Sequence, residues 1–315
     1  MDINPKSTAL VFPGQGSQRL GMGSALAKAE SQAADLFAQA DELLGFSLSQ
    51  ICWHGPGHAL DDTANTQPAL LTHSIAVLRA FRTRLPDFEP ACTAGHSMGE
   101  FSALVAAGSL SFPDALGLVR ARGQAMKAAG EAQPGGMLAV LGLDLDTVEA
   151  ACEAVSSETG LTVGVANDNC PGQVVVSGQE AALETTLERL SHAGARKVVR
   201  LAVSIASHSS MMEPAQVRFG QSLKDVPLLD PRIPLYGNVE ARPLHTSEAV
   251  VAELNAQLTS RVRWTESVSA MIAAGTNTFL ELGPGNTLSG LIRRIDSTVR
   301  CLALDAPDSF EKLSA

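Results

Sequence analysis

Short apolar runs rich in β-branched residues alternate with longer stretches in which apolar residues recur at helical spacing. Thr8–Phe12 is the first such run, and Pro13 and Gly14 end it. The next stretch, from Ser17 to about Leu44, has helical periodicity and predicts a helix. Alternation of this kind predicts a largely parallel sheet covered by helices, the α/β class. A second strand and two further helices are expected at Ala91–Gly95, Met98–Ala107 and Phe112–Ala129.

The pattern changes between residues 132 and 204, where short β-rich runs predominate. Helical stretches at about 145–157 and 179–193 lie between them, which gives the order β-α-β-β-α-β of a ferredoxin-like unit. Such a unit can fold as an insert, so we expect a small subdomain at 132–204 and an α/β core formed by 1–131 and 205–315. The strands expected in the insert are Met137–Leu141, Thr162–Ala166, Gln173–Ser177 and Lys197–Val203, and the later core elements are Ile233–Tyr236, Thr278–Leu282 and the helix Thr287–Ile295.

The composition of the 315-residue chain limits the classes of protein to which it can belong. Hydrophobic residues make up 45% and charged residues 18%, which excludes a disordered chain. No apolar run approaches the roughly 18 residues that cross a bilayer, and residues 1–10 lack a basic segment followed by an apolar one. A cytoplasmic location is therefore the expectation. The net charge of −10 disfavours nucleic acid as a partner, because phosphates attract a basic surface.

The cysteines are odd in number and scattered, and no two are spaced as Cys-x-x-Cys. Neither a disulfide framework nor a zinc site is indicated by this spacing. We expect buried free thiols at Cys52, Cys92, Cys152, Cys170 and Cys301.

A Gly-x-Ser-x-Gly pattern lies between a predicted strand and a predicted helix, at Gly95-His96-Ser97-Met98-Gly99. Glycines suit this place because a sharp strand-to-helix turn brings the backbone too close for larger side chains. The serine hydroxyl is thereby presented at the N-terminus of the following helix. Ser97 is therefore the candidate nucleophile, and a glycine-rich turn without chemistry is the alternative.

A serine hydroxyl is a poor nucleophile until a base accepts its proton, so a histidine must approach Ser97 in space. His73 is expected on a helix, and His96 is expected to point away from the turn by alternation. His208 follows a predicted strand at the return from the insert, where a structural or a catalytic histidine would fit. The remaining histidines lie in polar or glycine- and proline-rich surroundings and are expected to be solvated: His54, His58, His192 and His245.

Several motifs resemble those of the malonyl-CoA:acyl-carrier-protein transacylases, in that family's order and at its spacings. The resemblance covers nearly the whole chain. It implies an α/β-hydrolase-like core interrupted by a ferredoxin-like subdomain, with the active site in the cleft between them. The motifs are Phe12-Pro13-Gly14-Gln15-Gly16-Ser17-Gln18, Thr66-Gln67-Pro68-Ala69-Leu70, Gly95 to Glu100, Arg122-Gly123, Asn167 to Gln173, Ser207-His208, Val262-Arg263-Trp264-Thr265 and Gly283-Pro284-Gly285.

The resemblance also implies roles for individual residues. Ser97 matches the acylated serine and His208 its general base. The backbone N–H groups of Gln15 and Met98 match an oxyanion hole, in which each donor supplies roughly 3–4 kcal/mol. In the family a backbone carbonyl orients the histidine, and the resemblance places it at Arg263. Many relatives have glutamine there, so the role of the Arg263 side chain stays open.

Arg122 matches the arginine that binds the free carboxylate of the malonyl group. A planar guanidinium holds a carboxylate through two parallel charge-assisted bonds. At roughly 1.5–3 kcal/mol for each bond, malonyl would be favoured over acetyl by about 10²–10⁴-fold. Arg120 is rotated by about 200° on the same predicted helix and should face elsewhere. Asn167 and Gln173 match positions beside the coenzyme A and pantetheine channel, although their sequence is also typical of a turn.

The implied activity is that of an acyl-carrier-protein S-malonyltransferase of fatty-acid synthesis. Malonyl-CoA acylates Ser97, coenzyme A leaves, and the phosphopantetheine thiol of a carrier protein takes the malonyl group. This ping-pong cycle needs no metal and no bound organic cofactor. The expected partners are an acyl carrier protein and a coenzyme A thioester, without nucleic acid or membrane, and the chain is expected to be a monomer. Because the net charge repels an acidic carrier at long range, a local basic patch is expected, with Arg196, Lys197 and Arg200 as candidates.

Alternatives remain open on the sequence alone. A free-standing acyltransferase of a polyketide synthase or of a malonate decarboxylase system would use the same residues. A serine thioesterase or acyl hydrolase would share Ser97 and His208 but would have no use for a carboxylate-binding arginine. Ser207 precedes His208 where many malonyl-specific relatives have Phe, so an α-branched extender such as methylmalonyl also stays open.

Overall fold

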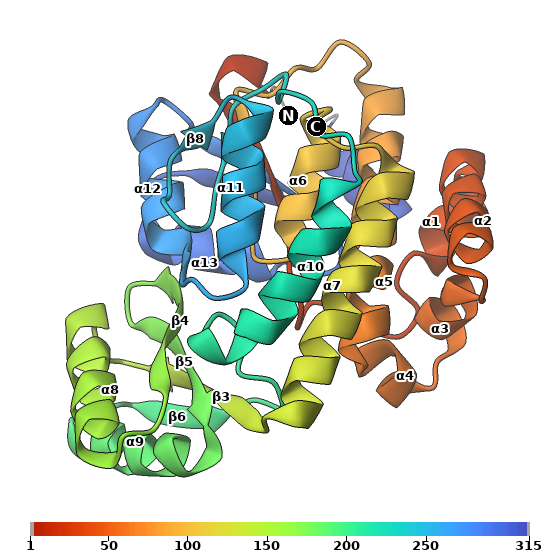
Figure 1. Cartoon of the computed structure of the whole chain (residues 1–315). Coiled ribbons are helices and arrows are strands. Elements are labelled where there is room, and N and C mark those ends of the chain that lie inside the picture. Colours follow the sequence, from red (N-terminus) through yellow and green to blue (C-terminus); the bar gives the residue numbers. More distant parts are fainter. Residues whose placement is uncertain (1–2, 314–315) are drawn as a thin grey trace.

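The computed structural model describes residues 3–313 and contains two β-sheets (Figure 1). The larger sheet has the strand order β11-β10-β1-β2-β7-β8. All neighbouring strands are parallel except β8, which pairs antiparallel with β7. The predicted α/β class is therefore confirmed. The bounds are β1 Thr8–Phe12, β2 Cys92–Gly95, β7 Leu235–Tyr236, β8 Pro243–Leu244, β10 Thr278–Leu282 and β11 Arg300–Leu304.

Helices connect the strands and cover both faces of the larger sheet (Figure 1). Those before the second sheet are α1 Ser24–Ala29, α2 Ser31–Leu44, α3 Leu48–His54, α4 Gly57–Asp61, α5 Thr63–Arg84, α6 Gly99–Ala106 and α7 Phe112–Ala132. The later ones are α8 Leu145–Thr159, α9 Glu180–His192, α10 Glu213–Lys224, α11 Ser247–Gln257, α12 Trp264–Ala273 and α13 Thr287–Ile295. Short 3₁₀ helices occur at Pro5–Ser7, Ser210–Met212 and Pro307–Leu313.

Strand β1 lies inside the larger sheet, and all its side chains are buried. Leu10 and Phe12 belong to a hydrophobic cluster with α2, α5, α6, α7 and α10, whereas Ala9 and Val11 belong to another with α12 and α13. Successive side chains of a strand point to opposite faces, so an unbroken apolar run suits a strand with helices on both sides. The apolar run that predicted this strand therefore also reports its place in the middle layer.

The smaller sheet has the strand order β6-β3-β5-β4-β9. Its first four strands and the helices α8 and α9 follow one another as β-α-β-β-α-β, with antiparallel pairing, which is the predicted ferredoxin-like arrangement. Helices α8 and α9 cover one face through Leu138 and Val140 of β3, and the opposite face is turned toward the rest of the molecule. The bounds are β3 Gly135–Leu141, β4 Val163–Cys170, β5 Gln173–Gln179, β6 Lys197–Arg200 and β9 Val262–Arg263.

Strand β9 comes from the later part of the chain and pairs in parallel with β4. It therefore adds an edge strand from outside the insert to the smaller sheet. The domain boundaries at 131/132 and 204/205 stay a prediction.

The expected single helix from Ser17 to Leu44 is wrong. The chain turns at Gly21 and Gly23, where φ is 87° and 79°, and Glu30 is extended between α1 and α2. Positive φ suits glycine because it has no Cβ. Helix α5 was expected only as the helix that carries His73, without bounds, because it is buried on nearly all sides and so lacks an amphipathic pattern.

The cysteines are free thiols, as expected; Cys301 is half-buried and the others are buried. Within residues 3–313 no helix combines the length and the apolar character that crossing a bilayer requires. Over the same residues, no group of three or more His, Cys, Asp or Glu side chains is arranged to hold a metal ion.

Candidate active site

A cavity of about 560 Å³ lies between the two sheets. Its walls come from the loops after β1 and β2, from α7, from α13 and from the inner face of the smaller sheet, where Met137, Ala139 and Val175 point into it. In open α/β sheets, ligands bind beyond the carboxyl ends of the strands. Ser97, Arg122 and His208 all line this one cavity.

The backbone from Gly95 to Gly99 makes a sharp turn from β2 into α6, as the glycine pattern predicts. A Cβ on Gly95 would lie 2.0 Å from the carbonyl carbon of Gly99, and one on Gly99 would lie 2.2 Å from the oxygen of Phe12. Only glycine fits at either position. Ser97 lies at the apex with φ of 51°. For a residue with a Cβ such a conformation costs about 1–3 kcal/mol and persists only where the surroundings hold it.

Asn238, which follows β7, holds the turn from the side. Its Oδ1 accepts the N–H of Ser97 at 2.7 Å, and its Nδ2 donates to the carbonyl oxygen of Gly95 at 2.8 Å. Glu253 on α11 in turn accepts the N–H of Asn238 at 2.7 Å. These groups are buried, where hydrogen bonds are stronger than in water. The strained serine is therefore fixed by a buried polar network.

The hydroxyl of Ser97 lies against the ring of His208, with Oγ 2.8 Å from Nε2. On the other side of the ring, Nδ1 lies 2.9 Å from the carbonyl oxygen of Gln257 and 3.1 Å from that of Ser260. Carbonyl oxygens only accept, so Nδ1 carries the proton and Nε2 presents a lone pair to the serine O–H. His208 is thereby placed to accept the proton of Ser97.

The expectation that the carbonyl of Arg263 orients His208 is wrong. Gln257 ends α11, where the carbonyl groups have no partner within the helix and are free to bind another group. The carbonyl of Arg263 instead accepts from Oγ of Ser267 at 2.9 Å, one turn further along α12. Its guanidinium pairs with Glu266 at the surface and does not line the cavity.

Burial and the nearby positive charge of Arg122 lower the pKa of His208 to about 3. The two carbonyl oxygens at Nδ1 oppose this effect only in part. The ring is therefore neutral at physiological pH, which is the state a general base requires.

The guanidinium of Arg122 is the third group at Ser97, and the residue is 1% exposed. Its Nη2 donates to Oγ of Ser97 at 3.2 Å and to Oε1 of Gln257 at 2.9 Å, and Nη1 donates to Oε1 of Gln67 at 2.9 Å. These partners are all neutral. Arg120 faces elsewhere, as expected, and donates to the carbonyl of Ala64 at 2.6 Å.

No acidic side chain within residues 3–313 forms an ion pair with Arg122. Burial lowers the pKa of its guanidinium to about 10, against an opposing effect of Glu100, so Arg122 remains cationic at neutral pH. A buried charge without a charged partner is unfavourable on its own. The cavity is therefore electrostatically suited to an anionic group beside Ser97.

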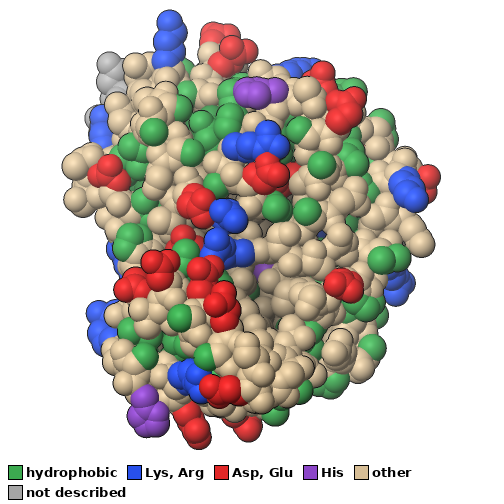
Figure 2. Space-filling model, turned by 60° about the vertical axis from the view of Figure 1, so that its left-hand side comes forward, with side chains coloured by type: hydrophobic (Ala, Val, Ile, Leu, Met, Phe, Trp, Pro, Cys, Tyr) green, Lys and Arg blue, Asp and Glu red, His purple; other side chains and the backbone are tan. Residues whose placement is uncertain are grey.

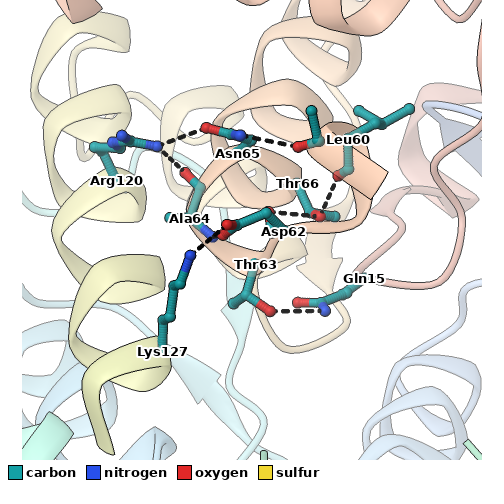
Figure 3. A network of polar contacts seen from close by, with 10 residues as sticks. Gln15, Leu60, Asp62, Thr63, Ala64, Asn65, Thr66, Arg120 and Lys127 are labelled. Carbon is teal, nitrogen blue, oxygen red and sulfur yellow. Dashed lines mark hydrogen bonds and ion pairs between the residues drawn. The ribbon is translucent and has the colours of Figure 1, made fainter. Parts of the chain in front are cut away.

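Gln15 and Met98, the expected oxyanion donors, line the same cavity as Ser97. The side chain of Gln15 is anchored, because its Nε2 donates to Oγ1 of Thr63 at 3.1 Å (Figure 3). Thr63 begins α5, and Asp62 caps this helix by accepting the N–H of Ala64 at 3.0 Å. The loop after β1 is thereby tied to the start of α5.

Two basic residues of α7 bind the same end of α5 (Figure 3). Arg120 donates to the carbonyl of Ala64 and to Oδ1 of Asn65 at 2.8 Å, and Lys127 pairs with Asp62 at 2.5 Å. Arg122 lies between these two residues along α7. The contacts therefore fix the helix that presents the buried guanidinium.

Asn167 and Gln173, expected beside the coenzyme A channel, line the cavity from the smaller sheet. Asn167 is buried in β4, and Oε1 of Gln173 accepts from Arg294 of α13 at 2.6 Å. The structure brings both to the cavity wall, and their role in binding stays a prediction.

His96 lines the cavity, so the expectation that it points away from the turn is wrong. Its Nε2 lies 2.8 Å from Oδ1 of Asn169 in β4. Alternation applies only within a strand, and β2 ends at Gly95, before the positive φ of Ser97 redirects the chain. His73 does lie on a helix, α5, where it contacts Asp305 at 2.8 Å.

The candidate docking residues Arg196, Lys197 and Arg200 lie at and just before β6. Arg200 forms an ion pair with Glu180, which compensates part of their charge. On the face shown in Figure 2, basic side chains also lie beside acidic ones rather than forming a field of one sign. A docking role for this patch stays a prediction.

Sequence reasoning missed Gln257 and Glu100. Gln257 contacts His208 through its main chain and Arg122 through its side chain, and Nε2 of Gln257 also donates to Oε2 of Glu100 at 2.5 Å. Glu100 lies in the motif that ends the glycine turn, but nothing local marks this glutamate as buried. The burial of Gln257 arises from the packing of α11 against the turn, which leaves no periodic signal in the sequence.

A serine on a strand-to-helix turn, a neutral histidine on its oxygen and a buried arginine beside both define an enzyme that forms an acyl-serine. Consistent with this class, the family described as "Acyl transferase domain" matches residues 9–301. The chain belongs to this acyl transferase family, together with malonyl CoA-acyl carrier protein transacylases.

The similarity to individual relatives extends over nearly the whole chain. The malonyl CoA-acyl carrier protein transacylase of Bacillus subtilis (strain 168) is 42% identical over 305 residues, which is 96% of this chain and 95% of that protein. The solved transacylase of Xanthomonas oryzae pv. oryzae has a TM-score of 0.94 at 41% identity and covers 99% of this chain and 98% of its own. A malonyl-transacylase in complex with a type II PKS acyl-carrier protein has a TM-score of 0.93 at 38% identity, with 97% and 98% covered.

Proposed function

We propose that this chain transfers a malonyl group from malonyl-CoA to the phosphopantetheine thiol of an acyl carrier protein, through an ester on Ser97, in fatty-acid synthesis. The observation that carries the proposal is the buried guanidinium of Arg122, which has no acidic partner within residues 3–313 and lies 3.2 Å from the Ser97 hydroxyl. Relatives at about 40% identity that are named malonyl CoA-acyl carrier protein transacylase support it.

In the first half of the reaction, Nε2 of His208 takes the proton of Ser97 as Oγ bonds to the thioester carbonyl carbon. The carbonyl oxygen becomes an oxyanion and accepts hydrogen bonds from the N–H groups of Gln15 and Met98. Collapse of this intermediate breaks the carbon–sulfur bond, and His208 passes its proton to the departing sulfur. Free coenzyme A leaves, and malonyl-Ser97 remains.

In the second half, the phosphopantetheine thiol of the carrier enters the same cavity and gives its proton to His208. The thiolate attacks the ester carbonyl, the same N–H groups stabilise the oxyanion, and the bond to Oγ of Ser97 breaks. His208 returns its proton to the serine oxygen. The enzyme is restored, and the carrier holds malonyl as a thioester.

Arg122 selects the acyl group in both halves. A terminal carboxylate can accept from both Nη atoms at once, which compensates the buried charge and sets the direction of the acyl chain. At roughly 1.5–3 kcal/mol for each bond, malonyl is preferred to acetyl by about 10²–10⁴-fold. A thioesterase or acyl hydrolase would have no use for this cation, so the position of Arg122 favours the transferase.

Intact-mass spectrometry tests the proposal directly. Wild type mixed with malonyl-CoA should gain one malonyl group, and a phosphopantetheinylated carrier should then remove it. Ser97→Ala should gain none. An ester that disappears in water without a carrier would indicate a hydrolase, and faster loading from methylmalonyl-CoA than from malonyl-CoA would overturn the choice of acyl group.

A further inference from the structure

Glu100 is a buried carboxyl group for which the two half-reactions have no use. It lies in the first turn of α6 and is 1% exposed. Its Oε2 accepts from Nδ2 of Asn238 at 2.9 Å and from Nε2 of Gln257 at 2.5 Å. Within residues 3–313, its Oε1 has no hydrogen-bond partner. An ionised carboxylate here would lose its hydration and gain only two hydrogen bonds from neutral amides. These do not compensate for the burial of a full charge.

Gln257 stands between Glu100 and Arg122. Its Nε2 donates to the carboxyl group, and its Oε1 accepts from Nη2 of Arg122 at 2.9 Å. The two ends of one amide therefore contact both groups, and the guanidinium and the carboxyl form no ion pair. The amide keeps the internal carboxyl from becoming the direct partner that Arg122 lacks.

Glu253 of α11 is the other acidic group that faces Glu100. Its Oε1 accepts the backbone N–H groups of Asn238 and Val239 at 2.7 and 2.8 Å. Burial raises the pKa of Glu253, but these two N–H donors oppose this effect. Each carboxyl accepts two N–H groups, but Glu100 is the more deeply buried, at 1% exposed against 5% for Glu253, and its Oε1 has no partner within residues 3–313. When two neighbouring buried carboxyls share one proton, it resides on the one whose charged form is less well solvated, which is Glu100.

We propose that Glu100 is a positioning residue that is protonated in the substrate-free enzyme, so that the charge of Arg122 stays available for the carboxylate of the acyl group. This inference rests on the proposed function. The proton belongs on Oε1, because Oε2 already accepts from two amides. An ionised Glu100 would be a second anion near Arg122 and would compete with the substrate.

The electrostatic surroundings agree with this assignment. Burial and the negative charge of Glu253 raise the pKa of Glu100 well above its usual range, against opposing effects of Gln257 and Arg122. The other titratable group at Arg122, His208, is neutral because its pKa is lowered to about 3. Arg122 is then the one positive charge among these four side chains, and the malonyl carboxylate is its natural complement.

Infrared spectroscopy at neutral pH tests the protonation state. The oxygen of a glutamine can accept from the same two amides, so Glu100→Gln copies the neutral acid. The spectrum of wild type minus that of this variant should contain the C=O stretch of a protonated carboxylic acid. Loss of a carboxylate band instead would overturn the proposal. If the variant does not fold, wild type labelled with ¹³C-carboxyl glutamate decides, because the absence of any protonated carboxyl resonance at neutral pH has the same meaning.

The kinetic consequence is a competition that begins when Glu100 ionises. In wild type, the KM for Ser97 loading from malonyl-CoA, divided by the KM for acetyl-CoA, should rise about tenfold at alkaline pH. A tenfold rise corresponds to a shift of about one unit in the pKa of Glu100 when the malonyl carboxylate binds. In Glu100→Gln this rise should be absent until the guanidinium of Arg122 itself loses its proton, close to its pKa of about 10. A rise that begins at lower pH in the variant would identify Arg122 as the titrating group and overturn the proposal. Failure of wild type to form malonyl-Ser97 would defeat the proposed function, whereas normal loading with an ionised Glu100 would defeat this inference alone.

Discussion

The main-chain carbonyl of Gln257 lies 2.9 Å from Nδ1 of His208, while the side chain of the same glutamine accepts from Arg122. One residue at the end of α11 therefore sets both the tautomer of His208 and the orientation of the Arg122 guanidinium. The two contacts use different parts of the residue. Loss of the arginine should consequently change acyl selection while His208 keeps its carbonyl partner.

Arg122→Ala should lower kcat/KM for Ser97 loading from malonyl-CoA by about 10²–10⁴-fold relative to acetyl-CoA, because two charge-assisted bonds to the carboxylate are lost. Rapid-quench measurement of both acyl-enzymes gives this ratio. Arg82→Ala is the control, since this arginine lies on α5 and binds the carbonyl of Ala106 outside the cavity. An unchanged malonyl preference in Arg122→Ala would contradict the assignment of the substrate.

The acid limb of the pH profile should lie at a pH far below the pKa of an ordinary histidine. Protonated His208 cannot accept the serine proton, so activity is lost as the pH falls through its pKa. Because this pKa is lowered to about 3 in the free enzyme, kcat/KM for malonyl loading should stay level through pH ~6.5, where unperturbed histidine titrates. A limb in kcat/KM near that value, with the fold intact by circular dichroism, would refute the assignment.

The charge of Arg122 is the second cause of that lowered pKa, after burial. Arg122→Ala should therefore move the acid limb to higher pH. A bound carboxylate compensates the same charge, so the limb in wild-type kcat should lie at higher pH than the limb in kcat/KM. An acid limb at the same pH in kcat and in kcat/KM, and at the same pH in wild type and Arg122→Ala, would show that Arg122 does not act on His208.

The parts of the site that could be predicted are those written locally in the chain. Ser97 lies in a turn whose glycines leave no room for a Cβ, and β1 is an apolar run bounded by Pro13 and Gly14. Gln257 could not be found in this way, because its burial results from α11 packing on a turn about 160 residues earlier in the chain. Strand β9 is two residues long, too short for any periodicity to show. The error at Arg263 has the same origin. The motif around Arg263 lies close in sequence to the carbonyl of Gln257 that contacts His208, but only the three-dimensional path of the chain identifies which carbonyl reaches the ring.

Thr63→Val should slow the chemical step rather than weaken binding. The valine keeps the shape of the threonine but removes the oxygen that accepts from Gln15 at 3.1 Å, so the loop with the proposed oxyanion donor loses its anchor. We expect kcat for Ser97 loading to fall about tenfold, corresponding to one hydrogen bond of about 1–1.5 kcal/mol, with little change in KM. Thr63→Ser keeps the hydroxyl and should retain most of the rate. Equal losses in both variants would show that the side chain of Thr63 acts through packing alone.

Two glycines of α7 should respond in opposite ways to alanine. Gly117 is exposed, and a Cβ there would meet nothing within 4 Å, so Gly117→Ala should stabilise the protein by about 0.5–1 kcal/mol through the lower backbone entropy of its unfolded chain. At Gly123 a Cβ would lie 2.6 Å from the carbonyl oxygen of Thr63 and 2.9 Å from Cα of Ala64, both backbone atoms. Helices α5 and α7 would have to separate, which costs about 1–3 kcal/mol and displaces the adjoining Arg122. The free energy of unfolding measured in urea and the rate of malonyl-Ser97 formation should therefore both fall for Gly123→Ala. Gly117→Ala, the same change in the same helix, should gain stability and keep its rate. Equal stability of the two variants would show that the close approach of α5 to α7 does not hold Arg122 in position.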